Sequence, residues 1–224
     1  MSGRFDRFIH GLSRVQLSDR ACNPYARGSR ENSIRRRNLR LYLDEVGQPR
    51  VLLVGEAPSH RGGRLTGIAF TSEQIMLCGV DGRFLGAERG YRQATPGPTR
   101  STEASATMVW ATIKSFDPLP LLWNAFPFHP FVGGNPCSNR IPTAGELRIG
   151  GPFLEALLEL FPIARIVAVG NLAERSLREL GIAHEKVRHP SQGGKRKFVE
   201  GVGRVAGGLE AKFQISNFEF RMKN

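Results

Sequence analysis

Short apolar runs that end near glycine or asparagine constrain the fold of this chain more than any other feature of its sequence. They lie at residues 50–55, 119–124 and 164–170, with a weaker run at 184–188, and helical patterns separate them. Continuous apolar runs are typical of strands that are buried on both faces, and strands that alternate with helices favour parallel pairing. The sequence therefore predicts an α/β fold, a three-layer α/β/α arrangement with a central, mostly parallel four-stranded sheet.

The remaining segments complete a single predicted domain that spans residues 1–224. Helices are expected at 31–46, 101–115, 143–160 and 172–180. Residues 62–98 are rich in Gly, Arg, Thr and Pro, so they predict a long loop with one short helix at 72–77. Residues 1–30 are polar and rich in Arg, and they are expected to form an irregular N-terminal extension.

The charge balance indicates a polyanionic partner. Lys and Arg total 32 against 20 acidic residues, which gives a formal net charge of +12. A positive field of this size attracts nucleic acids and speeds their encounter with the protein. Arg accounts for 26 of the 32 basic residues, and two explanations stay open. Arg can bind phosphate with two parallel hydrogen bonds, and a GC-rich bacterial genome favours Arg codons everywhere.

The cysteines and the apolar content exclude several classes of protein. Cys22, Cys78 and Cys137 are widely spaced and form no Cys-x-x-Cys pair, so no zinc site, iron–sulfur cluster or other metal site is expected. Reduced thiols fit a cytoplasmic protein. Residues 1–10 carry charges where a signal peptide needs an apolar run, and no run approaches the length of a membrane span.

Polar and aromatic residues with chemical potential follow the predicted strands. The stretches at 55–60 (GEAPSH) and 66–70 (TGIAF) follow the first strand, 121–124 (LLWN) ends the second, and 189–191 (HPS) follows the fourth. In parallel sheets, ligands bind beyond the carboxyl ends of the strands. The order of these stretches along the chain therefore predicts one shared pocket.

Each stretch also has an ordinary structural explanation when it is taken alone. Residues 55–58 could form any turn from a strand into a loop, and Asn124 could cap a turn. His189 could be a hydrogen-bonding loop residue, and Phe70 could belong to the core. All of them together, each in the loop after a strand, are much harder to explain in this way.

The set resembles the motifs of the uracil-DNA glycosylase superfamily. Residues 55–58 followed by 66–70 resemble its first motif and stacking aromatic, especially in the bacterial iron–sulfur branch. Residues 121–124 resemble the strand that delivers the base-reading Asn, and 189–191 resemble the second motif. The resemblance covers about residues 51–194, although identical residues are confined to these short motifs.

The resemblance implies a role for each pocket residue. Phe70 would stack on the flipped base, and stacking of this kind is worth about 1–3 kcal/mol. Asn124 would read the edge of uracil, because its amide can donate to O4 and accept from N3–H. His189 would donate to O2 as negative charge develops there, helped by backbone N–H groups near Glu56 and Ala57.

The first motif departs from the best-known branch at two positions. That branch has an Asp that orients water where this chain has Ala57, and Glu56 is expected to activate water instead. Glu56 could alternatively hydrogen-bond backbone and shape the loop. Ser59 stands where that branch has a Tyr that clashes with the methyl group of thymine. Exclusion of thymine must then come from elsewhere or be weaker.

The resemblance also implies contacts with the DNA backbone. Ser191 resembles the serine that holds a phosphate beside the lesion. Gly193 stands where an apolar wedge usually enters the minor groove, and a basic loop follows it at once. We expect this loop to grip the groove in place of the wedge, although it could also be a solvated turn. The expected DNA-contacting residues besides Ser191 are His60, Arg61, Lys195, Arg196 and Lys197.

These features together predict a monomeric DNA-repair enzyme that acts on uracil in single- or double-stranded DNA. It would flip the nucleotide out of the duplex, hydrolyse the N-glycosidic bond and leave an abasic site, without a metal or other cofactor. The alternative is a module that binds uracil or abasic sites with little turnover. A small-molecule nucleotide-binding protein is disfavoured, because no Gly-x-Gly-x-x-Gly or phosphate-loop motif follows the first strand.

Overall fold

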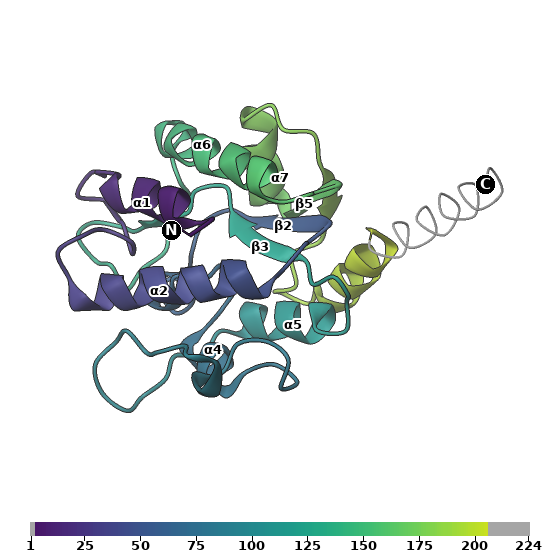
Figure 1. Ribbon diagram of the computed structural model, residues 1–224. Coiled ribbons are helices and arrows are strands. Elements are labelled where there is room, and N and C mark those ends of the chain that lie inside the picture. Colours follow the sequence, from purple (N-terminus) through teal and green to yellow (C-terminus); the bar gives the residue numbers. More distant parts are fainter. Residues whose placement is uncertain (1–2, 206–224) are drawn as a thin grey trace.

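A central four-stranded sheet organises the computed structural model, which describes residues 3–205 (Figure 1). Its strand order is β3-β2-β5-β6, and all three pairings are parallel. The strands are β2 (Val51–Gly55), β3 (Leu121–Asn124), β5 (Arg165–Val169) and β6 (Glu185–Val187). The predicted α/β class and the four strands are therefore confirmed, and the sheet is wholly parallel.

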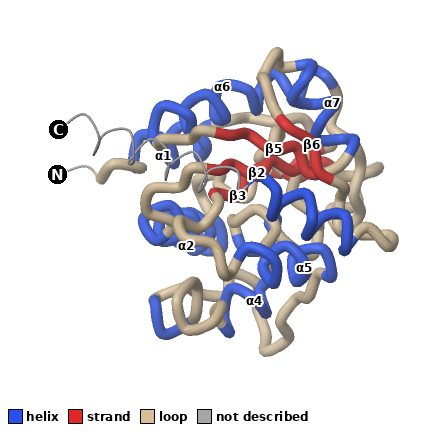
Figure 2. The backbone as a smooth tube through the Cα atoms, turned by 90° about the vertical axis from the view of Figure 1, so that its right-hand side faces the viewer, coloured by secondary structure: helices blue, strands red, loops and turns tan. Residues whose placement is uncertain are grey.

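Helices cover both faces of this sheet, as Figures 1 and 2 show. Helices α6 and α7 lie on one face, and α2, α4 and α5 lie on the other. Their bounds are α2 (Arg30–Glu45), α4 (Glu73–Cys78), α5 (Ala104–Ile113), α6 (Ala144–Leu160) and α7 (Asn171–Glu179). The predicted helices are thus confirmed to within a few residues. No helix within residues 3–205 is both long and apolar enough to cross a bilayer.

The helix boundaries follow from local hydrogen bonding. Ser29 caps α2 by accepting a hydrogen bond from the backbone N–H of Asn32 at 3.0 Å. Thr143 and Glu146 form a reciprocal capping box at the start of α6. Helix α2 is then fixed to the sheet, because the hydroxyl of Tyr42 accepts a hydrogen bond from the backbone N–H of Leu122 at 2.7 Å.

The N-terminal region differs from the expected irregular extension. Residues Asp6–Arg14 form α1, whose buried side chains include Phe8, Ile9 and Leu12. The ring centroid of Phe8 lies 5.5 Å from that of Trp123 in β3. The expectation was wrong because charged residues surround a short amphipathic pattern, and tertiary contact with the core decides its structure.

A second, two-stranded sheet was not predicted either. β1 (Ala21–Cys22) pairs in antiparallel fashion with β4 (His129–Pro130). Two-residue strands carry no periodic signal, so the sequence alone could not reveal them. This pairing places the N-terminal region beside the chain that follows β3.

Residues 62–98 contain more regular structure than a loop with one short helix. Besides the expected α4, they form α3 (Gly63–Thr66) and the 3-10 helix η1 (Ala87–Arg89). The buried carboxylate of Glu73 holds the far end of the segment, because it accepts hydrogen bonds from the hydroxyl of Thr95 and from the N–H of Ser101. The segment is therefore anchored by a buried, satisfied carboxylate.

Replacement of Phe8 tests whether α1 belongs to the core. Phe8→Ala should lower the free energy of unfolding by about 3–5 kcal/mol, because it removes a buried ring from its contact with Trp123. Urea denaturation followed by tryptophan fluorescence measures the change. The exposed neighbour Arg7 offers a matched control, and Arg7→Ala should change stability little. Equal, small effects would show that α1 contributes little to folding.

Candidate active site

A cavity of about 430 Å³ opens beyond the carboxyl ends of β2, β3 and β5. Six predicted pocket residues line it together: Glu56, Ala57, Phe70, Asn124, His189 and Ser191. The predicted DNA-contacting residues His60, Arg61, Lys195, Arg196 and Lys197 are not among its lining residues.

Gly55 is the point at which the pocket depends on the absence of a side chain. A Cβ atom at this position would lie 2.5 Å from Cζ of Phe70 and 2.6 Å from Oδ1 of Asn124. The parallel register places Gly55 directly beside Asn124 at the ends of β2 and β3. The Phe70 ring and the Asn124 amide can therefore meet over this glycine only because it has no side chain.

Phe70 is held in an unusual backbone conformation, with φ of 51° in the left-handed region. Two buried threonines fix the turn around it. The hydroxyl of Thr66 donates to the carbonyl of Thr71 at 2.9 Å, and that of Thr71 donates to the carbonyl of Ala69 at 2.9 Å. The indole N–H of Trp110 donates to Thr71 Oγ1 at 3.0 Å. A non-glycine residue in this region costs about 1–3 kcal/mol, which the surrounding bonds must offset.

Asn124 presents an amide that the protein itself does not satisfy. The residue is only 5% exposed, and no other residue within 3–205 hydrogen-bonds to its side chain. Among residues 3–205, the fully buried side-chain atoms without a partner are Oγ of Ser59 and Nε1 of Trp123, so water in the cavity can reach the Asn124 amide. A ligand that offers both an acceptor and a donor can replace this water, so the side chain is suited to reading a polar edge.

His189 is oriented by its neighbour two residues along the chain. Nδ1 of His189 lies 2.7 Å from Oγ of Ser191 and accepts a hydrogen bond from the Ser191 backbone N–H at 3.2 Å. Because a backbone N–H can only donate, Nδ1 is the acceptor and the proton of the neutral ring lies on Nε2. Burial and the positive charge of Arg188 lower the pKa of His189. The imidazole therefore offers a neutral Nε2–H donor.

The close approach of His189 to the sheet depends on a second glycine. A Cβ atom at Gly170, where φ is 92°, would lie 2.9 Å from Cβ of His189. The backbone N–H of Gly170 donates to the carbonyl of Val187 at 2.9 Å, which joins the ends of β5 and β6. Gly170 also begins α7, whose N-terminal residues line the pocket and favour negative charge there.

Glu56 carries the perturbed carboxyl group of the pocket. Burial raises its pKa to about 7, and the positive charge of Arg175 opposes the shift only in part. No residue within 3–205 hydrogen-bonds to this carboxyl group. Its backbone is fixed, because the carbonyl of Glu56 accepts a hydrogen bond from the N–H of Phe126 at 2.9 Å. A carboxyl group in a cleft whose pKa lies near 7 can take up and release protons at physiological pH.

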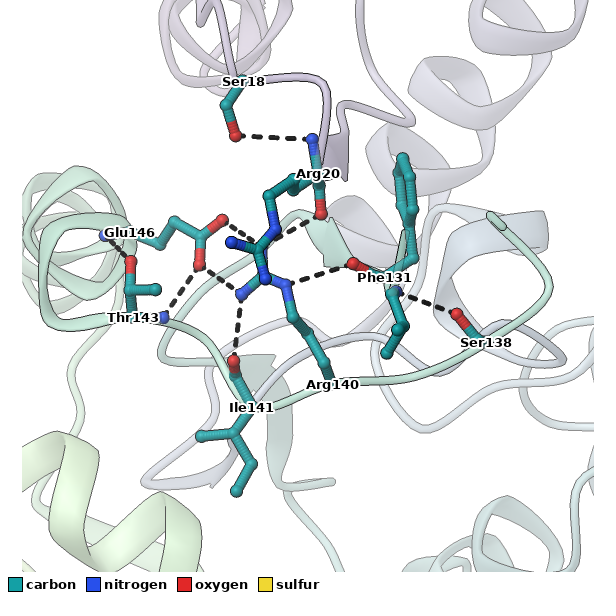
Figure 3. Close-up of polar contacts among 9 residues, drawn as sticks. Ser18, Arg20, Phe131, Ser138, Arg140, Ile141, Thr143 and Glu146 are labelled. Atoms are coloured by element: carbon teal, nitrogen blue, oxygen red, sulfur yellow. Dashed lines mark hydrogen bonds and ion pairs between the residues drawn. The ribbon is translucent and has the colours of Figure 1, made fainter. Parts of the chain in front are cut away.

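The sequence reasoning missed Arg140, which lines the pocket and whose polar contacts Figure 3 shows. Its guanidinium bonds both carboxylate oxygens of Glu146 at 2.6 and 2.8 Å, and it also donates to the carbonyls of Arg20 and Phe131. These bonds fasten Arg140 to the start of α6. The Thr143-x-x-Glu146 pattern marks the helix start, but nothing in the sequence identifies Arg140 as the partner of Glu146.

Two further residues that the sequence reasoning missed support the loop after β2. The imidazole of His129 is buried between two carbonyl oxygens, with Nδ1 2.8 Å from that of Pro58 and Nε2 3.1 Å from that of Pro136. Oδ1 of Asn139 accepts a hydrogen bond from the backbone N–H of His60 at 2.9 Å. Glu103 also lines the pocket and accepts a hydrogen bond from Ser105. Isolated polar residues gave no signal in the sequence for these contacts.

The basic segment after the His-Pro-Ser stretch is helical, so the expectation of a loop was wrong. Residues 195–205 are helical, and Lys195, Arg196 and Lys197 lie exposed in the first turn. The turn before them is tight, because a Cβ atom at Gly194 would lie 2.0 Å from the carbonyl oxygen of His189. The helix forms because Phe198, Val202 and Val205 recur at helical spacing and are buried.

Among residues 3–205, the cysteines and acidic residues form no site for a metal ion. No group of three or more His, Cys, Asp or Glu side chains that could hold a metal occurs within residues 3–205. Cys22 is half-buried, and Cys78 and Cys137 are exposed and unpaired with each other.

Comparisons with known proteins agree with this geometry. Residues 43–202 match a model of the uracil DNA glycosylase superfamily. No curated protein matches the chain. Among solved structures, that of wild-type SMUG2 from Pedobacter heparinus is similar, with a TM-score of 0.63 and 16% sequence identity. The match covers 94% of this chain and 100% of that chain. At this level of identity, the likeness supports the fold alone.

The raised pKa of Glu56 predicts how its removal changes stability with pH. The pKa of Glu56 is about 7 in the folded protein, against 4.5 for an ordinary Glu. Ionisation of this carboxyl group therefore costs more free energy in the folded protein than in the unfolded one. This cost grows as pH rises between these two values and is complete above about 7. Glu56→Gln removes it, so the variant should be more stable than the wild type at about pH 8 and nearly equal at about pH 4, below both pKa values.

Urea denaturation at the two pH values measures this difference. Glu159 is an exposed carboxylate at the far end of α6, and Glu159→Gln is the matched control that removes the same charge. A stability gain that does not depend on pH, or one that Glu159→Gln reproduces, would contradict the raised pKa of Glu56.

Proposed function

Because this chain belongs to the uracil DNA glycosylase superfamily, a family of glycosylases that act on DNA, we propose that the base it removes from DNA is uracil. It flips the uracil nucleotide out of the DNA, hydrolyses the N-glycosidic bond and leaves an abasic site. One observation carries the proposal. The buried, unpartnered amide of Asn124 faces a cavity that also contains the Phe70 ring and the neutral Nε2–H donor of His189.

Asn124 and Phe70 supply recognition of the base. The amide nitrogen of Asn124 donates to O4 of uracil, and its oxygen accepts from N3–H. Cytosine carries the opposite donor and acceptor at these positions, so it would leave the amide unpaired at a cost of about 1–3 kcal/mol. Phe70 provides the flat surface on which the flipped base stacks.

His189 stabilises the departing base. As the bond between C1′ and N1 breaks, its electron pair moves onto uracil and negative charge develops at O2. The Nε2–H of His189 donates to this oxygen, and a preorganised donor of this kind contributes about 3–4 kcal/mol. The ring can do so as a neutral group, because Ser191 keeps Nδ1 an acceptor.

Glu56 accepts the proton of the attacking water. The water oxygen bonds to C1′ while the uracil anion leaves, and the released proton passes to the Glu56 carboxylate. A base with a pKa of about 7 is partly ionised at neutral pH and accepts a proton readily. Ala57 supplies no carboxylate at the next position, so Glu56 takes this role in the first motif.

Discrimination against thymine is expected to be incomplete. Ser59 lines the pocket where a bulky aromatic residue would exclude the methyl group of thymine. A serine side chain is too small to create that clash. Thymine and other bases that carry a substituent at C5 are therefore the first competitors to examine.

The DNA backbone is held at the pocket mouth. The hydroxyl of Ser191 rotates from His189 to a phosphate, which the backbone N–H of Ser191 permits because it continues to bond Nδ1. The exposed first helical turn with Lys195, Arg196 and Lys197 grips the groove in place of an apolar wedge. His60 and Arg61, in the loop after β2, add further contacts with the DNA backbone.

A damage-binding module with little turnover is the second candidate function. Two observations favour it: Glu56 is substantially protonated at neutral pH, and Ala57 replaces a carboxylate. In this role the pocket would hold uracil or an abasic site and shield it, while hydrolysis stayed slow.

Oligonucleotides with a single uracil separate the two functions. The purified chain is incubated with uracil in a single strand, opposite G and opposite A, and alkali then cleaves the abasic sites. Strand breaks that accumulate over many turnovers support the enzyme, and His189→Ala should lower the rate about 10²–10³-fold. A gel shift without breaks would support the binding module instead, and neither breaks nor a shift would contradict both functions.

Asn124→Asp tests recognition of the base directly. The carboxylate cannot donate to O4 of uracil, but it can accept from the amino group of cytosine, so the ratio of uracil to cytosine excision should fall by about tenfold or more. Single-turnover rates on the two substrates measure this ratio. Asn171 lines the same cavity and is exposed, so Asn171→Asp is a matched control. Unchanged selectivity in Asn124→Asp would remove Asn124 from base recognition.

A further inference from the structure

A second cavity lies on the surface between α1 and α2, outside the proposed uracil pocket. Its volume is about 470 Å³, and α1 and α2 lie side by side in both views of the backbone (Figures 1 and 2). The lining residues are Asp6, Ile9, His10, Ser13, Arg27, Arg36, Arg37 and Arg40. This groove is therefore strongly basic, with four arginines and one acidic residue.

Arg27, Arg36 and Arg37 of the groove have two further arginines nearby, Arg35 and Arg64. We call these five residues the arginine track. None of the five lies within 4.0 Å of a carboxylate oxygen among residues 3–205. The fourth arginine of the groove, Arg40, pairs instead with Asp6 and Asp44.

Four of the five arginines of the track, all except Arg37, are held in place by neutral acceptors. Arg36 donates to the carbonyls of Tyr25 and Ala26 at 2.8 and 2.7 Å. Arg27 lies 2.8 Å from Nδ1 of His10. These bonds position the guanidinium groups without a direct ion pair, although the more distant carboxylates of Glu31 and Glu73 act on the charge of Arg35.

Like charges also lie close together along the track. Burial and the charge of Arg27 lower the pKa of Arg36, and burial and the charge of Arg64 lower the pKa of Arg35. Cations that repel one another raise the free energy of the folded protein. A bound anion would reverse this cost, and a chain of anions would do so along the whole track.

The track begins at the pocket mouth. Nε and Nη2 of Arg64 each donate to the carbonyl of His60 at 3.2 Å, beside the pocket-lining residues Ser59 and Gly63. Arg35 donates to the carbonyl of Leu65 at 3.1 Å in the same loop. The positive charges therefore run from the pocket across the N-terminal half of α2 to the groove beside α1.

We propose that the arginine track binds the phosphodiester backbone of DNA beyond the flipped nucleotide, as a second DNA-contacting surface. A set of neighbouring guanidinium groups, four of them held by hydrogen bonds, suits successive phosphates, because each guanidinium can bond two phosphate oxygens. The proposal rests on the proposed function only in taking DNA as the substrate. It assigns a role to part of the Arg excess, and it extends the DNA site well past the pocket.

The double variant Arg27→Ser/Arg37→Ser tests the track, because both side chains are exposed. Its affinity for uracil-free duplex DNA is measured at several salt concentrations. Each lost phosphate contact should reduce the slope of log K against log [salt] by about one, so the double variant should lose up to about two. In the wild type, affinity should also rise with DNA length until the strand reaches the groove, and the variant should lack this last increment.

The double variant Arg50→Ser/Arg83→Ser provides the matched control. It removes the same charge at the opposite end of the sheet, where Arg50 precedes β2 and Arg83 lies near the end of α2. It should keep most of the wild-type slope and the full dependence on length. An equal loss in both variants, or a wild-type slope and length dependence in Arg27→Ser/Arg37→Ser, would overturn the proposal.

Two further measurements keep these outcomes separate. Thermal melting shows whether each variant is folded, and if the double variant is not, Arg37→Glu alone should still weaken binding of long DNA. Because the DNA in this assay contains no uracil, its result does not depend on excision. A protein that binds along the track but removes no uracil would refute the proposed function and retain the track.

Discussion

The close approach of two strands at Gly55 is the constraint on which the pocket depends. Parallel pairing brings the ends of β2 and β3 level, so that Asn124 lies directly beside Gly55. The missing side chain leaves room for the Asn124 amide and for the Phe70 ring, which arrives from a separate turn. Gly170 permits the approach of His189 at the end of β5 in the same way. The pocket therefore depends on two glycines at the carboxyl ends of the strands, where a side chain would fill the space that Phe70, Asn124 and His189 occupy.

This arrangement keeps two groups of the pocket in unfavourable states. The left-handed Phe70 and the poorly solvated Glu56 each cost free energy in the folded protein. They persist because the surroundings are strongly tied. Two buried threonines fix the Phe70 turn, and the ion pair with Glu146 fixes the pocket-lining Arg140. Local cost inside a rigid frame is what a preorganised binding site requires.

The sequence identified those parts of the structure whose signals are continuous along the chain. Apolar runs revealed the four strands, and Phe70, Asn124 and His189 could be assigned to one pocket because each follows or ends a strand. Contacts between distant residues left no such signal, as with Arg140 and Glu146 or with His129 and Pro58.

Two errors had the same physical origin. Charged residues obscured the short apolar pattern of α1, and they also obscured the pattern of Phe198, Val202 and Val205 in the helix after the His-Pro-Ser stretch. In both places burial against the core determines the helix, and the charged residues only occupy its exposed side. The same high Arg content that indicated DNA therefore concealed two helices. The arginine track lies beside α2, whereas the pocket brings together the uncharged amide of Asn124, the His189 imidazole with its lowered pKa and the Glu56 carboxyl group with a pKa of about 7. In the two proposed roles, positive charge on the surface binds the DNA backbone through interactions that salt screens, while Asn124 and His189 read the base through hydrogen bonds.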